Sequence, residues 1–305
     1  MKILLTGASS FSGYWIAEKL HRAGASVVAP LRGTVNGYDG VRGERVRKLA
    51  AIAEIVPGCS FGDQAFLEVI GGRSFDVLCH HAACVADYRS LDFDVVGALA
   101  ENTREIRKVL QTMLERGLRA VIATGSVFEQ DEGAGNNPPR AFSPYGLSKG
   151  LTWQVIRHWC THLGLDLGKF VIANPFGPLE EPRFGAYLVN SWRKGLVAEV
   201  RTPRYLRDNI PVDLLALAYA GFVQTTLNGS GKLGPSYYVE TQGAFAERFA
   251  CAMQGRLNMK CEVKLLTQTD FSEPLARINT DTVDGAAFGW DEEAAWDRVA
   301  EYYLG

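Results

Sequence analysis

Hydrophobic and polar positions follow two alternating patterns along the first half of the chain. Short apolar runs suited to buried strands are followed by stretches with apolar residues three and four apart, as on one face of a helix. In chain order these segments are KILLTG, GYWIAEKLHRAG, SVVAPL, FDVLCHHAA, ENTREIRKVLQTMLERG and RAVIATGS. Strands that alternate with amphipathic helices predict a parallel sheet covered on both faces. The pattern therefore predicts an α/β fold of the doubly wound class.

The longest amphipathic stretch covers residues 101–117. Its apolar residues recur at intervals of three and four and form one stripe, made of Ile106, Val109, Leu110, Met113 and Leu114. Gly117 follows directly, at the place where a glycine often caps the carboxyl end of a helix. We therefore expect one helix here, with this stripe facing the core.

The regular alternation ends after a further strand, expected at residues 169–173 and ended by the segment NPFGP. Beyond it, short periodic runs predict a smaller mixed lobe at residues 237–240, 246–253, 262–267 and 291–303. The segment 129–142 contains glycines, asparagines and paired prolines, which are typical of a loop. We expect a lid over a functional site to lie in this loop.

The charge balance gives no sign of a strongly charged partner. The 305-residue chain carries 32 basic and 34 acidic side chains, with a formal net charge of -2. No Lys/Arg block provides an electrostatic footprint for nucleic acid or an anionic membrane. At 47% hydrophobic residues the chain can bury a substantial core, and no run reaches the roughly 18 apolar residues of a membrane span. We expect a globular protein that binds neither nucleic acid nor a membrane.

The six cysteines indicate a reducing compartment. They include no CxxC pair, and several lie in apolar runs, where a buried reduced thiol is usual. The start of the sequence, MKILLTG, leads from a strand-like run into a glycine loop and does not resemble a signal peptide. We therefore expect a cytoplasmic protein, and we expect no metal site.

A loop framed by glycines, TGASSFSG, directly follows the first expected strand. Gly7 and Gly13 lie between this strand and a helix that begins near Tyr14. A tight turn here lets backbone N–H groups and the positive end of the helix approach a diphosphate, as in dinucleotide-binding folds. Ser10 stands where a G-x-x-G-x-x-G pattern would place its middle glycine. On these residues alone, a plain strand-to-helix turn with closely packed glycines is the alternative.

The end of the second expected strand indicates which dinucleotide is bound. An acidic residue there would accept hydrogen bonds from ribose hydroxyls, whereas an arginine pairs with a 2′-phosphate. The sequence reads Leu31-Arg32-Gly33, which favours NADP over NAD; a solvated arginine at a strand end is the alternative. Asp63, after the next short apolar run, is placed to accept from an adenine amino group, although an aspartate in a loop also fits a turn.

A tyrosine and a lysine four residues apart open the next helical segment, in SPYGLSKG. Positions i and i+4 share one helix face, so the phenol of Tyr145 and the ammonium of Lys149 can meet. A nearby cation lowers a phenol pKa from its usual value of about 10, which would make the pair an acid–base unit. A surface pair without chemical significance is the alternative.

Several short motifs occur in one order along the chain, namely TGASSFSG, HHAA, ENTREI, ATGSVFE and the Tyr145/Lys149 pair. Together they resemble the extended short-chain dehydrogenase/reductase superfamily. ANPFGP and LRDNIPVDLLALA extend the likeness to its NAD(P)-dependent epimerase/dehydratase family, which acts on nucleotide sugars. The resemblance runs from Met1 to about Ala218. It implies a Rossmann dinucleotide-binding domain and a smaller substrate lobe, which we expect at residues 1–173 and 205–243 and at residues 174–204 and 244–305, respectively.

The resemblance also implies roles for individual residues. The family's catalytic group falls on Asn102, Thr124, Tyr145 and Lys149. Its cofactor-binding positions, with the arginine and the aspartate discussed above, fall on Gly7, Ser10, Phe11, Gly13, Arg32, Asp63, Ala82, Ala83 and Lys149. Substrate-binding positions fall on Ser126, Asn174 and Arg207, of which the arginine can grip two diphosphate oxygens at once. The alternatives are turn-forming hydroxyls, a helix N-cap at Asn102, a strand-end asparagine, and a surface arginine paired with Asp208.

Departures from the family pattern narrow the expected reaction. The family's dehydratases place an Asp-Glu pair after the catalytic threonine, and members that epimerise next to a ketone use a cysteine there; this chain has Gly125-Ser126. Simple hydride transfer remains. Because Arg32 favours NADP, we expect a homodimeric NADPH-dependent reductase of a keto-sugar nucleotide, with NAD possible as cofactor. An NAD-dependent nucleotide-sugar 4-epimerase and a non-catalytic NADP-binding sensor are the alternatives.

Overall fold

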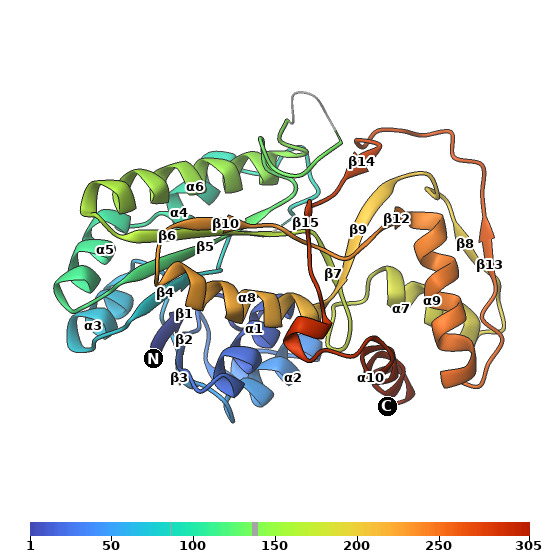
Figure 1. Ribbon diagram of the computed structural model, residues 1–305, viewed down its shortest axis with the longest axis horizontal. Helices are drawn as coiled ribbons and strands as arrows, with labels where there is room; N and C mark the ends of the chain where they lie inside the picture. Colours follow the sequence, from blue (N-terminus) through green and yellow to red (C-terminus); the bar gives the residue numbers. More distant parts are fainter. Residues whose placement is uncertain (86, 136–139) are drawn as a thin grey trace.

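The protein is described by a computed structural model that covers residues 1–85, 87–135 and 140–305. A sheet of seven parallel strands lies at its centre, in the order β10-β6-β5-β4-β1-β2-β3 (Figure 1). These strands are β1 (Lys2–Leu5), β2 (Ser26–Pro30), β3 (Glu54–Val56), β4 (Val77–His80), β5 (Ala120–Ser126), β6 (Asp166–Ile172) and β10 (Gly231–Leu233). The strand order reverses between β1 and β4, as in doubly wound dinucleotide-binding folds. The predicted parallel sheet is confirmed.

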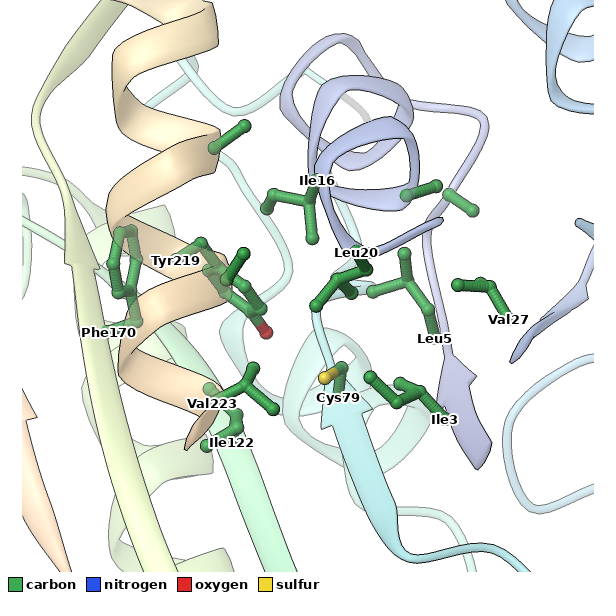
Figure 2. Packing of buried hydrophobic residues seen from close by; sticks show 14 of the residues in the cluster. Ile3, Leu5, Ile16, Leu20, Val27, Cys79, Ile122, Phe170, Tyr219 and Val223 are labelled. Carbon is green, nitrogen blue, oxygen red and sulfur yellow. The ribbon is translucent and has the colours of Figure 1, made fainter. Parts of the chain in front are cut away.

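Helices cover both faces of this sheet (Figure 1). One face carries α1 (Phe11–Arg22), α2 (Gly40–Leu49) and α8 (Val212–Thr226); the other carries α3 (Gln64–Gly72), α4 (Val95–Asn102), α5 (Ile106–Glu115) and α6 (Pro144–Leu163). Each face has its own buried apolar cluster, because strands covered on both sides bury both sets of side chains. In the first cluster, the ring of Tyr219 packs 4.7 Å from that of Phe170, near Cys79 and Ile122 (Figure 2). Within the described residues, every helix is too short or too polar to cross a membrane.

The single helix expected over residues 101–117 is two helices in the structure. α4 ends at Asn102 and α5 begins at Ile106, and Glu105 between them has a left-handed backbone with φ 50°. The apolar stripe starts only at Ile106. The polar residues 103–105 before it are not held in a helix by apolar contacts with the core, and the chain breaks there. Leu114 is 36% exposed, whereas the rest of the stripe is buried. It lies about 80° around the helix from Ile106, at the edge of the buried arc.

A smaller mixed lobe follows β6, as predicted (Figure 1). Its main sheet has the order β12-β9-β14, with β7 beside β9; β12 runs antiparallel to β9 and the other pairs are parallel. Two further strand pairs are β8 with β13 and β11 with β15. The strands are β7 (Asn174–Phe176), β8 (Ala198–Val200), β9 (Leu206–Pro211), β11 (Pro235–Ser236), β12 (Tyr238–Thr241), β13 (Val263–Leu265), β14 (Ala276–Arg277) and β15 (Asp281–Thr282).

The lobe has its own core, built largely from aromatic side chains. Its helices are α7 (Phe184–Arg193), α9 (Gln242–Arg256) and α10 (Glu292–Leu304). One short 3-10 turn, Ala286–Phe288, precedes α10, and another, Val35–Gly37, lies between β2 and α2 beside the central sheet. The buried cluster between these helices includes Phe176, Trp192, Phe245, Phe249 and Trp296. The segment NPFGP, expected only to end the preceding strand, contributes β7 to the lobe's main sheet. The chain therefore changes from one sheet to the other at Ala173.

Candidate active site

The carboxyl ends of β1, β4 and β5 meet at one edge of the central sheet, the edge at which doubly wound folds bind ligands. The glycine-framed loop follows β1, His81 follows β4, and Thr124 lies near the end of β5. Ser10 caps α1 by accepting a hydrogen bond from the backbone N–H of Gly13 at 3.1 Å. Its backbone has φ -74°, a value that needs no glycine. The serine therefore replaces the middle glycine of the pattern without strain.

The other two glycines of the loop have no room for a side chain. Gly7 has φ 72°, and a Cβ there would lie 2.8 Å from the backbone nitrogen of Ala82, which precedes Ala83. A Cβ on Gly13 would lie 2.2 Å from the carbonyl oxygen of Gly7. The loop is thus held close to the start of α1 at Phe11, where first-turn N–H groups lack acceptors within the helix and form its positive end. These features fit the diphosphate of a dinucleotide.

Lys149 and Thr124 contact each other where β5 ends and α6 begins. Ser143 caps α6 by accepting from the N–H of Gly146 at 3.2 Å, and a proline occupies the first helical position. This start places Tyr145 and Lys149 one turn apart on α6. Lys149 is buried, and its Nζ donates a hydrogen bond to the carbonyl oxygen of Thr124. Three of the four predicted catalytic residues, Thr124, Tyr145 and Lys149, therefore lie at one corner of the sheet edge.

The environment of Tyr145 differs from the predicted one. Burial raises the pKa of its phenol, the negative charge of Glu129 adds to the rise, and Arg183 opposes it. Lys149 does not offset the burial, since its ammonium is bound to Thr124. The expected lowering of the phenol pKa is therefore wrong for this structure. Tyr145 is a protonated phenol at neutral pH and is suited to donating a proton.

Asn102 is held by three hydrogen bonds. Its carbonyl oxygen accepts from His80 Nε2 at 2.9 Å, its Oδ1 accepts from the N–H of Cys84 at 2.8 Å, and its Nδ2 donates to Thr152 Oγ1 at 3.2 Å. As the last residue of α4 it does not cap the start of a helix, which was the alternative role. Asn102 instead joins the segment after β4 to α6, the helix that carries Tyr145.

His81 connects the glycine-framed loop to Thr124, a contact that the sequence did not reveal. Its Nε2 lies 3.2 Å from Ser10 Oγ and 3.1 Å from Ser12 Oγ, and its Nδ1 lies 3.0 Å from Thr124 Oγ1. Burial lowers the pKa of His81 to about 3, and the charge of Lys149 adds to the effect. The imidazole is therefore neutral at physiological pH. The histidine doublet at a strand end was its one signal in the sequence.

A chain of alternating charges lies beside β5, with three members buried and the fourth, Lys232, exposed. Lys169 Nζ lies 2.7 Å from both Glu129 Oε2 and Glu132 Oε1, and Lys232 Nζ lies 2.6 Å from Glu132 Oε2. Glu129 is fully buried, and its Oε1 accepts from the N–H of Ser126 at 2.8 Å. Glu129 and Lys169 line the same pocket as Thr124 and Lys149. The one signal of this cluster in the sequence was a lysine inside the apolar run of β6.

The loop expected at residues 129–142 begins with packed residues. Both glutamates of the buried charge cluster belong to it, and Ala134 forms a β-bridge with Ile278. Positions 136–139, where the asparagines and prolines of the expected lid stand, lie outside the described residues. The lid therefore stays a prediction.

Two arginines form a positive patch between the glycine-framed loop and the end of β2. Arg32 is exposed two residues after β2. Arg42 on α2 donates from Nη2 to Ser9 Oγ at 2.8 Å and lies over the ring of Tyr38 at 4.9 Å. Burial lowers the pKa of Arg42, and the neighbouring charge of Arg32 also lowers it. Two cations held this close are suited to an anionic group.

Arg45, also on α2, connects the glycine-framed loop to the segment that leads into the lobe. Its guanidinium is fully buried. Nε donates to the carbonyl oxygen of Ser9 at 3.0 Å, Nη1 donates to that of Leu179 at 2.7 Å, and Nη2 pairs with the carboxylate of Glu181. Leu179 has a left-handed backbone with φ 67°. The segment 179–181 is thus attached to the dinucleotide side of the molecule.

Asp63 and Ser126 already take part in local backbone hydrogen bonds. Asp63 caps α3, where its Oδ1 accepts from the N–H of Phe66 at 2.8 Å. Ser126 Oγ accepts from the N–H of Phe128 at 3.3 Å. Asn174 is half-buried and begins β7, beside the same sheet edge. The ligand-binding roles expected of these three residues stay predictions.

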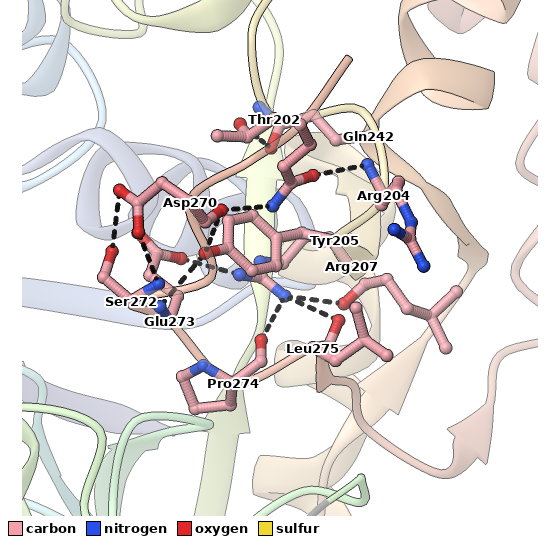
Figure 3. Close-up of polar contacts among 12 residues, drawn as sticks. Thr202, Arg204, Tyr205, Arg207, Gln242, Asp270, Ser272, Glu273, Pro274 and Leu275 are labelled. Carbon is pink, nitrogen blue, oxygen red and sulfur yellow. Dashed lines mark hydrogen bonds and ion pairs between the residues drawn. The ribbon is translucent and has the colours of Figure 1, made fainter.

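Arg207, the expected diphosphate ligand, is engaged by the segment before β14 (Figure 3). Its Nη1 donates to the carbonyl oxygens of Leu206 at 2.9 Å and Pro274 at 3.1 Å. Its Nη2 lies 2.6 Å from Glu273 Oε2, and the guanidinium lies 4.5 Å over the ring of Tyr205. A diphosphate that binds Arg207 must therefore compete with the carboxylate of Glu273.

Asp208 does not pair with Arg207. It is fully buried, and its two carboxylate oxygens accept from the N–H groups of Tyr237 and Asn279, each at 3.0 Å. Burial raises the pKa of Asp208, and these two hydrogen bonds counteract the rise. The alternative of a surface arginine paired with Asp208 is therefore wrong.

Solved structures share this fold over their whole length. The UDP-glucuronic acid 4-epimerase of Bacillus cereus, in complex with UDP-glucuronic acid and NAD, has a TM-score of 0.74 and 14% identity, with 100% of this chain and 99% of that chain covered. For the UDP-glucose 4-epimerase of Thermotoga maritima with UDP-glucose, the values are 0.71, 17%, 100% and 99%. For the dTDP-glucose 4,6-dehydratase of Streptomyces venezuelae with NAD, they are 0.68, 18%, 100% and 97%. These likenesses establish the fold.

The family is established by the sequence itself. Residues 3–225 match the NAD dependent epimerase/dehydratase family, and this range contains the glycine-framed loop, Thr124, Tyr145, Lys149 and Arg207. No curated protein matches the sequence of this chain at a significant level. The chain therefore belongs to the NAD dependent epimerase/dehydratase family, whose members are extended short-chain dehydrogenase/reductase enzymes.

Proposed function

We propose that this chain is an NADPH-dependent reductase of a keto-sugar nucleotide, with Tyr145 as the proton donor. One observation carries the proposal: Tyr145 lies one helical turn from Lys149, which is buried and hydrogen-bonded to the main-chain carbonyl oxygen of Thr124. Gly7, Gly13 and Arg32 would hold NADPH, which would supply the hydride for the carbonyl carbon of the substrate. Tyr145 gives its proton to the carbonyl oxygen, which Thr124 holds, and the ketone becomes a secondary alcohol. Lys149 holds the main chain at Thr124, and Asn102 holds α6, the helix that carries Tyr145, against the segment after β4.

The expected substrate class is supported from two sides. Arg207 and Asn174 lie in the lobe sheet on neighbouring strands, β9 and β7, where a diphosphate could reach both. Solved structures with this fold include enzymes that bind UDP-glucose and UDP-glucuronic acid. Gly125 and Ser126 follow Thr124, and neither offers the acid and base that expulsion of water needs. Reduction of a ketone is therefore preferred over dehydration.

The proposal includes the organisation of the chain. Residues 1–173 and 205–243 form the dinucleotide-binding domain, from which Arg207 on β9 reaches the substrate, and residues 174–204 and 244–305 form the substrate lobe. Two copies form a cytoplasmic homodimer. Ser126 and Asp63 contact the sugar and the adenine, respectively, through oxygens with spare acceptor capacity.

A 4-epimerase that retains NAD is the second candidate. The structure of the Bacillus cereus 4-epimerase with NAD, covered over 99% of its length, favours it. Both candidates use Tyr145 for proton transfer, so the cofactor decides between them. The cations Arg32 and Arg42 beside the end of β2 favour NADP, from which a net reductase draws its hydride. We therefore place the reductase first.

A panel of sugar nucleotides and their 4-keto derivatives, assayed with NADPH, with NADH and with no added cofactor, tests the proposed function. We expect one NADPH to be consumed for each ketone reduced, because the hydride leaves with the product. Interconversion of two sugar nucleotides without a change in nicotinamide absorbance would instead establish the epimerase. Dinucleotide binding without turnover of any sugar nucleotide would contradict both.

The positive patch should decide between the two dinucleotides. We expect Arg32→Ala and Arg42→Ala each to weaken NADPH binding by about ten- to a hundredfold, because each removes a charged partner of the 2′-phosphate. Binding of NADH should change little, since it lacks that phosphate. Titration of nicotinamide fluorescence measures both affinities. Arg47→Ala, an exposed arginine on the same helix, is the control; equal losses for NADH and NADPH would contradict the assignment.

The pairing of Arg207 with Glu273 should limit substrate affinity. We expect Glu273→Gln to lower the KM for the sugar nucleotide severalfold at unchanged kcat, because the diphosphate no longer competes with a carboxylate. Arg207→Ala should raise that KM by about tenfold or more. Steady-state kinetics with the best substrate of the panel measures both effects.

A matched control is Glu199→Gln. Glu199 pairs with Lys264 at 3.0 Å, and its side chain is 47% exposed, against 46% for Glu273. It lies on β8, outside the contacts of Arg207. A KM that responds equally to both glutamate substitutions would show that Arg207 does not meet the diphosphate.

A further inference from the structure

We propose that Ser10 and Ser12 fix the tautomer of His81, and that His81 thereby leaves the hydroxyl proton of Thr124 free for the substrate oxygen. The inference rests on the proposed function in one respect, because it takes Thr124 as the residue that holds this oxygen. His81 is then a positioning residue, acting on the substrate through Thr124. In this proposal Ser10, at the middle position of the glycine pattern, acts as a hydrogen-bond donor to His81.

The ring of His81 has polar partners on both nitrogens. Nδ1 faces Thr124 Oγ1 at 3.0 Å, and Nε2 faces Ser10 Oγ at 3.2 Å and Ser12 Oγ at 3.1 Å. A neutral imidazole has one N–H donor and one acceptor nitrogen, so the two sides of the ring cannot play the same role. His81 is buried and neutral, and its main-chain N–H is bound to Thr6 Oγ1 at 3.0 Å. The ring is held in place, and only its proton can change position.

The cap of α1 favours Nε2 as the accepting nitrogen. Ser10 Oγ already accepts the N–H of Gly13 at 3.1 Å, which occupies one of its lone pairs and leaves its hydroxyl proton free to donate. Nε2 of His81 is within reach of this proton, and the hydroxyl of Ser12 can donate to the same single lone pair in its place. With Nε2 accepting, the single ring proton resides on Nδ1.

The position of this proton controls Thr124. With the proton on Nδ1, His81 donates to Thr124 Oγ1, and the threonine keeps its own hydroxyl proton for a substrate oxygen. In the opposite tautomer Nδ1 is an acceptor, and Thr124 would spend its hydroxyl proton on the ring. A glycine at position 10 would leave Nε2 with the hydroxyl of Ser12 and without that of Ser10. By donating to Nε2, Ser10 keeps the ring proton on Nδ1, and Thr124 on the other side of the ring keeps its hydroxyl proton.

The experiment is to read the tautomer directly in the full chain labelled with 15N-histidine, without added ligand. The chain has 5 histidines, and the spectrum of His81→Asn identifies the signals of His81. We expect long-range 1H–15N spectra to show the proton on Nδ1 in the parent. In the double variant Ser10→Ala, Ser12→Ala, we expect the proton on Nε2, because no hydroxyl donates there. Ser9→Ala, in the same loop but bound to Arg42, should leave the tautomer unchanged.

A proton on Nε2 in the parent, or the same tautomer in the parent and the double variant, would overturn the inference. This measurement needs no substrate, so its failure is separate from a failure of the proposed reaction. Kinetics provide the second test. His81→Asn retains a donor near the position of Nδ1 and should keep most of kcat, whereas His81→Leu should lose about tenfold or more, with the KM for NADPH nearly unchanged in both. Equal losses of kcat in the two variants would overturn the role in positioning.

Discussion

Tyr145→Phe should lower kcat by roughly 10²–10⁴-fold and leave dinucleotide binding close to that of the parent, because it removes only the hydroxyl that donates the proton. The rings of Tyr88 and Phe93 meet that of Tyr145 edge-on at 5.7 Å and 6.0 Å, and these contacts persist in the phenylalanine variant. The site therefore keeps its shape. Single-turnover reduction of the best keto substrate measures the loss, and fluorescence titration measures the binding.

Tyr88→Phe is the matched control for this substitution. It removes a neighbouring hydroxyl at the same aromatic contact, and the proposed mechanism gives that hydroxyl no proton to transfer. Its kcat should lie within a few-fold of the parent's, the range expected when no catalytic group is lost. If Tyr145→Phe were as active as Tyr88→Phe, the proton donor would have to be another residue.

Lys169→Met should destabilise the folded chain by about 3–5 kcal/mol, because it leaves two buried glutamates without the cation that lies 2.7 Å from each. Glu129 is fully buried and Glu132 nearly so, and Lys232 reaches only the second of them. The ammonium of Lys169 also lies 4.9 Å over the ring of Trp153, so its alkyl stem is well packed and methionine fits the same space. Urea unfolding at neutral pH measures the change in free energy.

The control for this substitution is a lysine in an exposed pair. Lys260 lies 2.7 Å from Glu262 and its side chain is 77% exposed, so Lys260→Met should cost less than about 1 kcal/mol. Adding Glu129→Gln to Lys169→Met should restore part of the stability, since it removes the unpaired charge. A single Lys169→Met variant as stable as Lys260→Met would show that the cluster does not hold the fold.

Periodicity predicted the elements whose residues contact their own neighbours in the chain. Two local patterns were enough to predict β1, β2, β4, β5 and the start of α1. Strands covered on both faces give continuous apolar runs, and helices covered on one face give apolar residues three and four apart. The break at Glu105 and the strand β7 did not follow from them. β7 exists only through its pairing with β9, in which Asn174 lies opposite Asn209, 35 residues further along the chain.

The same limit applies to the candidate site. The ordered motifs located Thr124, Tyr145 and Lys149, and the structure places them at one sheet edge. Their surroundings were hidden, because His81 meets Thr124 43 residues away and Lys169 meets Glu129 40 residues away. These contacts depend on which strands lie side by side. A single sequence carries that information only as an unexplained lysine or histidine in an apolar run.

Burial also reversed one chemical expectation. The spacing of Tyr145 and Lys149 suggested a phenol with a lowered pKa, on the premise that the two side chains face each other. Lys149 instead donates to a main-chain carbonyl of β5, and desolvation then decides the state of Tyr145. The direction of the Lys149 side chain depends on β5, the strand on which α6 packs, and the spacing of two residues in the sequence does not contain that information.

The three hydrogen-bonding partners of Arg45 restrict how the two parts of the enzyme can move. Ser9, Leu179 and Glu181 share one buried guanidinium, so displacing either segment would deprive this buried charge of part of its hydrogen bonding. Residues 179–181 should therefore travel with the glycine-framed loop as one rigid body. If the lobe moves relative to the central sheet, these contacts exclude a hinge within residues 179–181, and the short step from Pro182 to the start of α7 is free of them.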